Sequence, residues 1–324
     1  MHQVVIDTDP GIDDAVAILL ALASPQEIDL LAITTVAGNV PLARTTQNAL
    51  KVLALVGGAR AGAGGERAAT RRVPVYAGAA QPLEGRAVTA QHVHGVTGLD
   101  GHALPDSGTA AAAGFAPDRI VELVLSKPVG SVTLCCIGPL TNIALALRQA
   151  PTLRARLREI VIMGGARREG GNITPCAEFN VYADPEAARE VFECGANLTL
   201  IPLDCTHRVL TSAARLARLE AQGTPLARTL VDLLKFNKQQ HERRCGTDGA
   251  PLHDPTTVAY LLEPGLFSGR RVHVTVECVS PLTRGMTVID WWQVSGRAPN
   301  AQVLDHVDAE GFFDLVWGRL ARLG

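Results

Sequence analysis

The stretch that decides the fold is Val4-Val5-Ile6-Asp7-Thr8-Asp9-Pro10-Gly11-Ile12-Asp13-Asp14-Ala15. Its apolar start predicts a buried strand of a parallel sheet, and the apolar run from Ala15 to Ala23 predicts a buried helix. The four carboxylates between them therefore lie at the carboxyl end of the strand, on the turn into the helix. Open α/β sheets bind their ligands in the crevice at this position, so a binding site is expected here.

Helix capping accounts for some of these acids. Pro10 suits the first helical position, and Asp9 suits the N-cap before it. Asp13 and Asp14 then fall in the first turn, where the helix dipole favours negative charge. Capping explains one or two acids but not four, because packed carboxylates repel one another and are costly to bury unpaired. A hard cation bound by carboxylate oxygens would remove that cost.

Composition narrows the class of protein. The chain has 324 residues, of which 47% are hydrophobic, and a formal net charge of −2, so no nucleic-acid partner is expected. Residues 1–3 lead straight into the first strand without a secretory signal, and no apolar run of spanning length lacks a charge or a break, so no membrane partner is expected either. Seven scattered cysteines without a Cys-x-x-Cys pair favour a reduced, cytoplasmic protein.

Predicted strands and helices alternate over the first two thirds of the chain. The alternation predicts a single α/β domain over residues 1–324, with an open, mostly parallel, doubly wound (Rossmann-like) sheet and helices on both faces. Residues 57–72 and 78–114 are expected to be loops, and 272–278 with 286–292 a hairpin-like pair at the sheet edge. The other predicted strands are 29–36, 73–76, 131–137, 159–163 and 198–203. The predicted helices are 42–56, 117–126, one that follows the motif 138–142 and ends at 148, 184–194, 211–221, 225–244, 254–262 and 311–323.

Polar residues gather where the predicted strands end. Each has an ordinary explanation as a turn residue, a loop residue or a helix cap. Because they share one edge of one sheet, their acid, amide and imidazole groups could together bind a polyhydroxyl compound beside a metal. The residues at strand ends are Asp9, Asn39, 137–138, 164 onward and Asp204. The residues expected in loops nearby are His94, 178–180 and 253–254.

The motifs resemble those of the inosine–uridine preferring nucleoside hydrolase family, through nearly the whole chain. Residues 7–14 resemble the signature of the family, and the order of the later motifs makes the resemblance very specific. It implies hydrolysis of the N-glycosidic bond of ribonucleosides, which are small-molecule substrates, in nucleoside salvage. The later motifs are 32–39, 92–95, 138–144, 163–165, 177–180, 184–187 and 253–255.

The resemblance also implies the members of the site. One calcium ion would be held by Asp9, Asp14, Asp254 and the backbone carbonyl of Ile137, with two waters and two ribose hydroxyls. Asp9 would act as general base and His253 as donor to the leaving base, or else His253 would support Asp254. Asp13, Asn39, Asn172, Glu178 and Asn180 would hydrogen-bond the ribose, Phe179 would form an apolar wall, and His94 and His253 would lie near the base.

The chain departs from well-known members of the family in two places. Residues 61–72 look like an insertion. The segment 236–244 lacks the tyrosine that broad-specificity members place against the base, so Gln240, His241 or Arg244 could take that role or could face solvent. We expect pyrimidine nucleosides to be at least as good substrates as purine nucleosides. The resemblance further implies a homo-oligomer, a dimer or tetramer, and Trp291-Trp292 would suit its interface or the core.

Two other classes remain open from the sequence. Haloacid-dehalogenase-like phosphatases also place an Asp-x-Asp after the first strand, but they need a lysine at a later strand end, and the strand ends here offer none. A non-catalytic calcium- or sugar-binding protein would need the metal and hydroxyl-binding groups but no acid near the leaving group, and His253 argues mildly against that class.

Overall fold

The computed structural model describes residues 1–61, 73–246 and 248–324. Within these residues, one nine-stranded sheet has the order β3-β2-β1-β4-β5-β6-β9-β7-β8. Neighbouring strands from β3 to β9 are parallel, whereas β7 and β8 are antiparallel to their neighbours. The strands are β1 (His2–Thr8), β2 (Ile28–Thr35), β3 (Val75–Ala77), β4 (Val132–Cys136), β5 (Leu157–Met163), β6 (Leu198–Ile201), β7 (Phe267–Val276), β8 (Thr287–Asp290) and β9 (Ala301–Val307).

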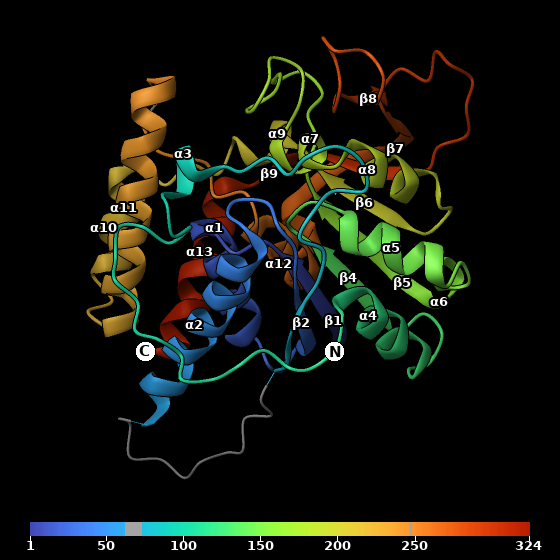
Figure 1. The fold of residues 1–324 in the computed structure, drawn as a ribbon. Helices are drawn as coiled ribbons and strands as arrows, with labels where there is room; N and C mark the ends of the chain where they lie inside the picture. The colour runs from blue at the N-terminus through green and yellow to red at the C-terminus, as the bar shows by residue number, and fades with distance from the viewer. Residues whose placement is uncertain (62–72, 247) are drawn as a thin grey trace.

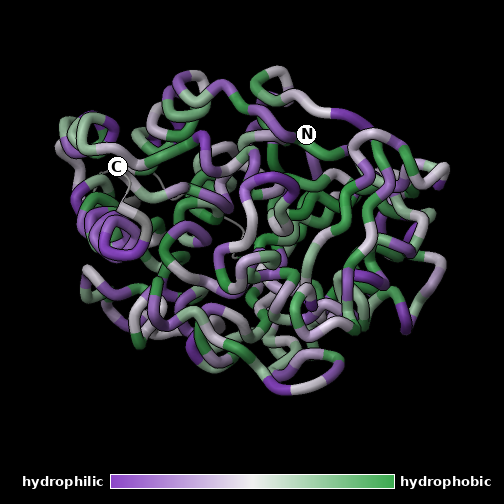
Figure 2. Tube along the Cα trace, turned by 90° about the horizontal axis from the view of Figure 1, so that it is seen from above, coloured by the Kyte–Doolittle hydropathy of each residue, from purple (hydrophilic) through white to green (hydrophobic). Residues whose placement is uncertain are grey.

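Helices cover both faces of the sheet (Figure 1). The apolar residues of α1, α2, α11, α12 and α13 form one core, and those of α4, α5 and α8 form a second. In Figure 2 the most hydrophobic segments run through the middle of the molecule. The open, doubly wound fold is therefore confirmed. The helices are α1 (Ile12–Leu22), α2 (Leu42–Ala61), α3 (Gln91–His94), α4 (Ala116–Leu125), α5 (Thr141–Gln149), α6 (Leu153–Arg156), α7 (Phe179–Ala183), α8 (Pro185–Glu193), α9 (Leu203–Thr206), α10 (Ala213–Glu220), α11 (Pro225–Cys245), α12 (Pro255–Leu262) and α13 (Ala309–Leu320).

The strand order reverses between β1 and β4, which creates the crevice that such sheets use for ligands. The chain directly after β4 lies tightly against the end of β1, since the Ile137 N–H donates to the Asp7 carbonyl at 2.8 Å. A Cβ atom at Gly138 would stand 2.6 Å from Asp9 Oδ1, so any larger residue at this position would displace the Asp9 carboxylate. The acids of the first turn thus lie directly at the switch point.

Most predicted elements are confirmed, but the short helices α6, α7 and α9 were not predicted, and three further differences bear on the site or the sheet. The helix expected to end at residue 56 continues to Ala61, so the start of the predicted 57–72 loop is helical, and residues 62–72 of that loop lie outside the described residues. The loop predicted over 78–114 contains the short helix α3. Strand β9 was not predicted, because in AQVLDHV polar residues interrupt the apolar ones without strict alternation, yet β9 joins β6 to the predicted β7–β8 pair.

The predicted cap of the first helix is wrong by two residues. Helix α1 begins at Ile12 with Gly11 as its N-cap, not at Pro10 with Asp9. The Asp14 carboxylate accepts the Gly11 N–H at 2.8 Å, so the helix is capped by its own first turn. This releases Asp9 from capping and leaves its carboxylate for the site.

Candidate active site

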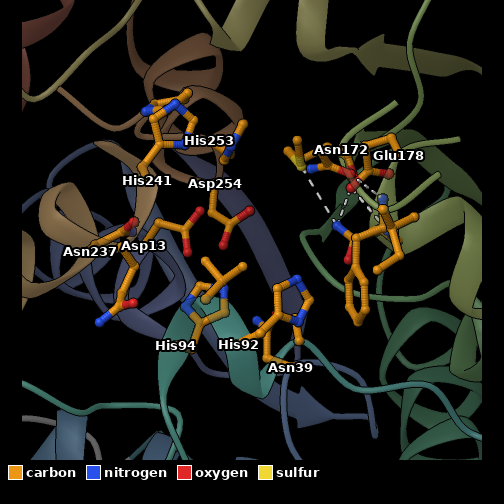
Figure 3. Close-up of a pocket in the computed structure, with 18 of the residues that line it drawn as sticks. Asp13, Asn39, His92, His94, Asn172, Glu178, Asn237, His241, His253 and Asp254 are labelled. Carbon is orange, nitrogen blue, oxygen red and sulfur yellow. Dashed lines mark hydrogen bonds between the residues drawn. The ribbon is translucent and has the colours of Figure 1, made fainter. Parts of the chain in front are cut away.

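A cavity of about 310 Å³ opens at the carboxyl ends of the central strands (Figure 3). All residues that were assigned a role in the site line it except Asp9 and Asp14, which are fully buried near Asp13. The predicted residues that line it are Asp13, Asn39, His94, Ile137, Asn172, Glu178, Phe179, Asn180, Gln240, His241, His253 and Asp254.

Buried carboxylates form one end of this cavity. Oxygens of Asp13, Asp14 and Asp254 lie within 4.8 Å of one another, although Asp254 comes from the start of α12 and the other two from α1. Thr8 Oγ1 donates to Asp14 Oδ1 at 2.5 Å and fixes that carboxylate. Burial raises the pKa of Asp13 to about 6 and raises the pKa of Asp254 well above its usual range, where the charges of Asp13 and Asp14 add to the effect.

Asp9 adds a fourth carboxylate with an unused oxygen. Its Oδ2 accepts the Asn39 N–H at 2.6 Å, whereas its Oδ1 is buried and has no hydrogen-bond partner within the described residues. Burial, and then the nearby charge of Asp14, raises the pKa of Asp9 well above its usual range. Buried acids that resist ionisation and include an unpaired oxygen fit the site of a hard divalent cation.

Amides and one carboxylate form the wall next to the acids. Glu178 caps α7, and its Oε2 accepts the Gly165 N–H at 2.9 Å. Burial raises the pKa of Glu178 to about 7, although backbone N–H donors oppose the shift. Asn180 Nδ2 donates to the carbonyls of Ile137 at 3.1 Å and Met163 at 3.2 Å, which ties α7 to the ends of β4 and β5.

Two further predicted residues lie on the same wall. Asn172 Oδ1 accepts the Phe179 N–H at 2.8 Å, so the amide orients the start of α7, which carries the aromatic ring. Phe179 packs with Ala90 and Ala183 in a small apolar cluster. The cavity therefore has an apolar strip between polar groups, as ligand sites generally do.

His94 reaches the cavity from α3, inside the long loop after β3. Its Nδ1 accepts the Ile12 N–H at 3.3 Å, and burial lowers its pKa to about 4. The imidazole is therefore neutral, with Nδ1 as acceptor. Asn39 stands nearby, where its Nδ2 donates to the Asp9 carbonyl at 3.1 Å and to Asp14 Oδ2 at 3.2 Å.

One face of α11 forms the opposite side of the cavity. Asn237, Gln240, His241 and Arg244 follow the spacing of one helical face and all line it, so Gln240 and His241 do not simply face solvent. Arg244 also donates from Nη2 to the Asn172 carbonyl at 3.3 Å, which links α11 to the loop after β5.

The sequence predicted no role for three polar residues that line the cavity, His92, His207 and Asn237, and it misplaced Asp204. His207 lies just after the end of β6 and α9, a strand-end position that could have been noticed, and Asn237 is one helical turn before the residues that were considered. Asp204 does not line the cavity. Its carboxylate instead accepts the backbone N–H groups of Arg167 at 2.7 Å and Arg168 at 2.9 Å, and so it holds the loop after β5.

Fold and site together define an α/β protein that binds a small polar molecule beside a cluster of acids. Among the described residues that line the cavity there is no lysine, so the phosphatase alternative lacks its required group. A family model of inosine–uridine preferring nucleoside hydrolases matches residues 4–314. The chain belongs to this family of N-ribosyl hydrolases, which confirms the resemblance read from the motifs.

Individual relatives cover the whole fold. The chain is 47% identical to an uncharacterized protein of Schizosaccharomyces pombe, over 99% of both chains. It is 42% identical to the pyrimidine-specific ribonucleoside hydrolase RihA of Salmonella agona, over 98% of this chain and 97% of the relative. The solved structure of a purine-preferring ribonucleoside hydrolase from Gardnerella vaginalis is 31% identical and has a TM-score of 0.89, over 99% of this chain and 98% of the other.

Proposed function

We propose that this protein is a calcium-dependent ribonucleoside hydrolase of nucleoside salvage that acts on pyrimidine nucleosides at least as well as on purine nucleosides. The observation that carries the proposal is the cluster of buried carboxylates at one end of a cavity whose walls are amides, imidazoles and one phenyl ring. Acids at that end suit a cation and sugar hydroxyls, whereas the α11 face suits a base.

Asp9, Asp14, Asp254 and the Ile137 carbonyl are the residues that would hold the calcium ion. The fit rests on the unpaired Asp9 Oδ1 and on the shared position of Asp14 and Asp254. Bound there, the ion would keep the carboxylates ionised and lower the pKa of a water molecule. Metal analysis after dialysis should find about one equivalent of calcium per chain, because the proposal has a single calcium site. Zinc instead, or full activity in chelator, would contradict the assignment.

Each side chain of the site has its own role in the proposed reaction. Asp9, whose Oδ2 is fixed by the Asn39 N–H, takes the proton of the attacking water. Asp13, Asn39 and Asn172, with Glu178 and Asn180, hold the ribose hydroxyls, and contacts that tighten as the sugar becomes oxocarbenium-like lower the barrier. Phe179 covers the sugar, and His94 and His253 contact the base as neutral imidazoles.

The preference for the base is assigned to the α11 face. Pyrimidines offer a carbonyl edge, to which Gln240 and His241 can donate, whereas purine activation at a ring nitrogen needs the proton donor that the absent tyrosine would supply. RihA, the relative named as pyrimidine-specific, supports this proposal. The purine-preferring relative shows that the same fold accommodates the other preference.

The test is release of reducing sugar from uridine, cytidine, inosine and adenosine. Parent protein, Gln240→Ala and His241→Ala are compared by kcat/KM, with Gln239→Ala as control because Gln239 is exposed and does not line the cavity. We expect both variants to change the ratio of uridine to inosine, and the control to leave it unchanged. Preference for inosine by more than about tenfold, unchanged in both variants, would refute the assignment.

We further propose a homo-oligomer, dimer or tetramer, in a reducing cytoplasmic compartment. Trp292 is 77% exposed next to Val294 at 86%, an apolar pair that an interface would cover. Two guanidinium groups lie over the Trp291 ring, with Arg167 at 3.9 Å and Arg270 at 4.6 Å from its centroid. The six cysteines whose surroundings are described are all free, which fits reducing conditions. In the described residues, no helix is both long and apolar enough to cross a membrane.

A further inference from the structure

The loop from β5 to α7, residues 164–178, carries part of the wall that the proposed function assigns to ribose. Asn172 lies within this loop, and Glu178 at its end is the N-cap of α7, a helix of five residues. Both side chains stand on the same side of the cavity (Figure 3). Loops are in general the more mobile parts of a fold. The position of these two groups therefore depends on the contacts that hold the loop.

The loop is closed by its own hydrogen bonds. The Asn172 N–H donates to the Ala177 carbonyl at 3.1 Å, and the Gly165 N–H donates to Glu178 Oε2 at 2.9 Å. The first bond closes the outer part of the loop, and the second joins its two ends. Asn172 and Glu178 thus belong to one hydrogen-bonded unit, so a shift of the first residues of the loop would move both groups.

Asp204 holds these first residues through their backbone. Its side chain is only 2% exposed, and it accepts the Arg167 N–H at 2.7 Å with Oδ2 and the Arg168 N–H at 2.9 Å with Oδ1. The guanidinium groups of the same two residues lie 3.9 Å and 3.8 Å from the carboxylate. A buried carboxylate with two N–H donors and two cations around it is satisfied by the protein itself. Asp204 is therefore an anchor for the loop and needs no ligand of its own.

Stabilisation of a helix does not explain Asp204. The residue lies in the first turn of α9, where the helix dipole favours an acid. Both of its carboxylate oxygens, however, accept N–H groups of the loop after β5, which is a different part of the chain. The sequence placed Asp204 among the polar groups of the cavity, whereas the structure places it outside the cavity and in contact with the loop that carries two of those groups.

Two other side-chain contacts hold the same part of the loop. Thr287, buried at the start of β8, accepts the Ala166 N–H at 2.8 Å. Thr287 and Asp204 together thus engage three consecutive backbone N–H groups. Glu169 Oε2 lies 3.0 Å from His207 Nδ1, but these side chains are 44% and 29% exposed, so water screens that contact. Asp204 therefore supplies two of the three buried bonds from side chains to this part of the loop.

We propose that Asp204 is a positioning residue for the ribose-binding wall, an inference that rests on the proposed function. Asp204 contacts no substrate. It fixes the backbone at Arg167 and Arg168, and the loop then holds Asn172 and Glu178 within hydrogen-bonding reach of the sugar hydroxyls. Without the carboxylate, two backbone N–H groups lose their acceptor and the loop shifts to find others. Misplacement of groups that orient a substrate by about 1 Å costs up to about 10²-fold in rate.

The experiment measures KM and kcat for uridine in Asp204→Ala and Asp204→Asn. We expect Asp204→Ala to lower kcat/KM by about 10-fold to 100-fold, with an increase in KM of at least about threefold. Asp204→Asn should lie between this variant and the parent, because its amide oxygen can still accept one N–H group. A mere loss of folded protein would lower the apparent kcat and leave KM unchanged. Asp308→Ala is the matched control and should leave KM unchanged, since Asp308 accepts the Gly311 N–H at 3.2 Å as the N-cap of α13, outside the cavity.

A double-mutant cycle provides the second measurement. Asn172→Ala and Asp204→Ala act through the same group, so their combined loss in kcat/KM should be smaller than the product of the separate losses. Gln240→Ala, on α11 across the cavity, should instead multiply with Asp204→Ala to within about twofold. An unchanged KM in both Asp204 variants, or full multiplication of the losses with Asn172→Ala, would overturn the role of Asp204. A parent protein inactive towards the whole nucleoside panel would instead overturn the proposed function, and this inference with it.

Discussion

Replacing Thr8 by valine tests how the acid cluster is held. Thr8 is fully buried at the end of β1, and its hydroxyl donates to Asp14 Oδ1 at 2.5 Å. Valine has nearly the same shape, so no cavity forms and only the donor is removed. Asp14 Oδ2 keeps the Gly11 N–H at 2.8 Å and Asn39 Nδ2 at 3.2 Å, so the carboxylate remains near its place but is less firmly fixed.

Two effects of this substitution can be given magnitudes. Loss of a hydrogen bond to a carboxylate should lower the free energy of unfolding by about 1.5–3 kcal/mol. Loss of an orienting partner should weaken metal binding by about 10-fold to 100-fold, as is usual for groups that hold a ligand in place. Denaturant unfolding measures the first effect, and calorimetric titration with calcium measures the second.

Thr45→Val is the matched control. Thr45 is also fully buried, but its hydroxyl donates to neutral carbonyls, those of Val36 at 2.9 Å and Leu42 at 3.0 Å. We expect it to cost about 0.5–1.5 kcal/mol of stability and to leave calcium affinity unchanged. If Thr8→Val binds calcium as tightly as the parent protein, then Asp14 is not a ligand that Thr8 orients, and the reasoning is refuted.

Three further outcomes are expected. Asp9→Asn should lower kcat by at least about 10²-fold while circular dichroism stays unchanged, because the amide oxygen can still accept the Asn39 N–H; a near-normal rate would show that Asp9 is not the base. Glu178 has a pKa raised from 4.5 to about 7, so the folded protein retains a proton that the unfolded chain releases, and stability should fall as pH rises through this window. Between pH 4.5 and 7, the free energy of unfolding of the wild type should fall by about 3 kcal/mol more than that of Glu178→Gln, as measured by denaturant unfolding. The same pH dependence of stability in both proteins would contradict the raised pKa of Glu178. Light scattering at micromolar concentration should give the mass of a dimer or tetramer, and a monomer throughout would contradict the oligomer.

Local sequence determined most of the strands and helices, and the edge of the sheet at which the polar residues lie. Apolar runs fixed β1 and α1 because burial on both faces requires continuous hydrophobic residues, and the acids of residues 7–14 had to follow β1 at its carboxyl end. The order of the motifs identified the family because each motif is a short turn whose residues are neighbours in the sequence. What local patterns missed was β9, whose place in the sheet depends on β6 and β7 as partners.

Only the tertiary structure decided which side chains meet. Helix α1 begins at Ile12, two residues later than predicted, because the Asp14 carboxylate accepts the Gly11 N–H and caps the helix. Asp9 is therefore not needed as a cap and belongs to the acid cluster. Asp254 joins Asp13 and Asp14 across about 240 residues of chain because α12 packs on α1, which no periodicity predicts. The pairing of His207 with Glu169 likewise depends on the paths of two loops after β5 and β6, and contacts between loops are set by the sheet order rather than by the residues beside them.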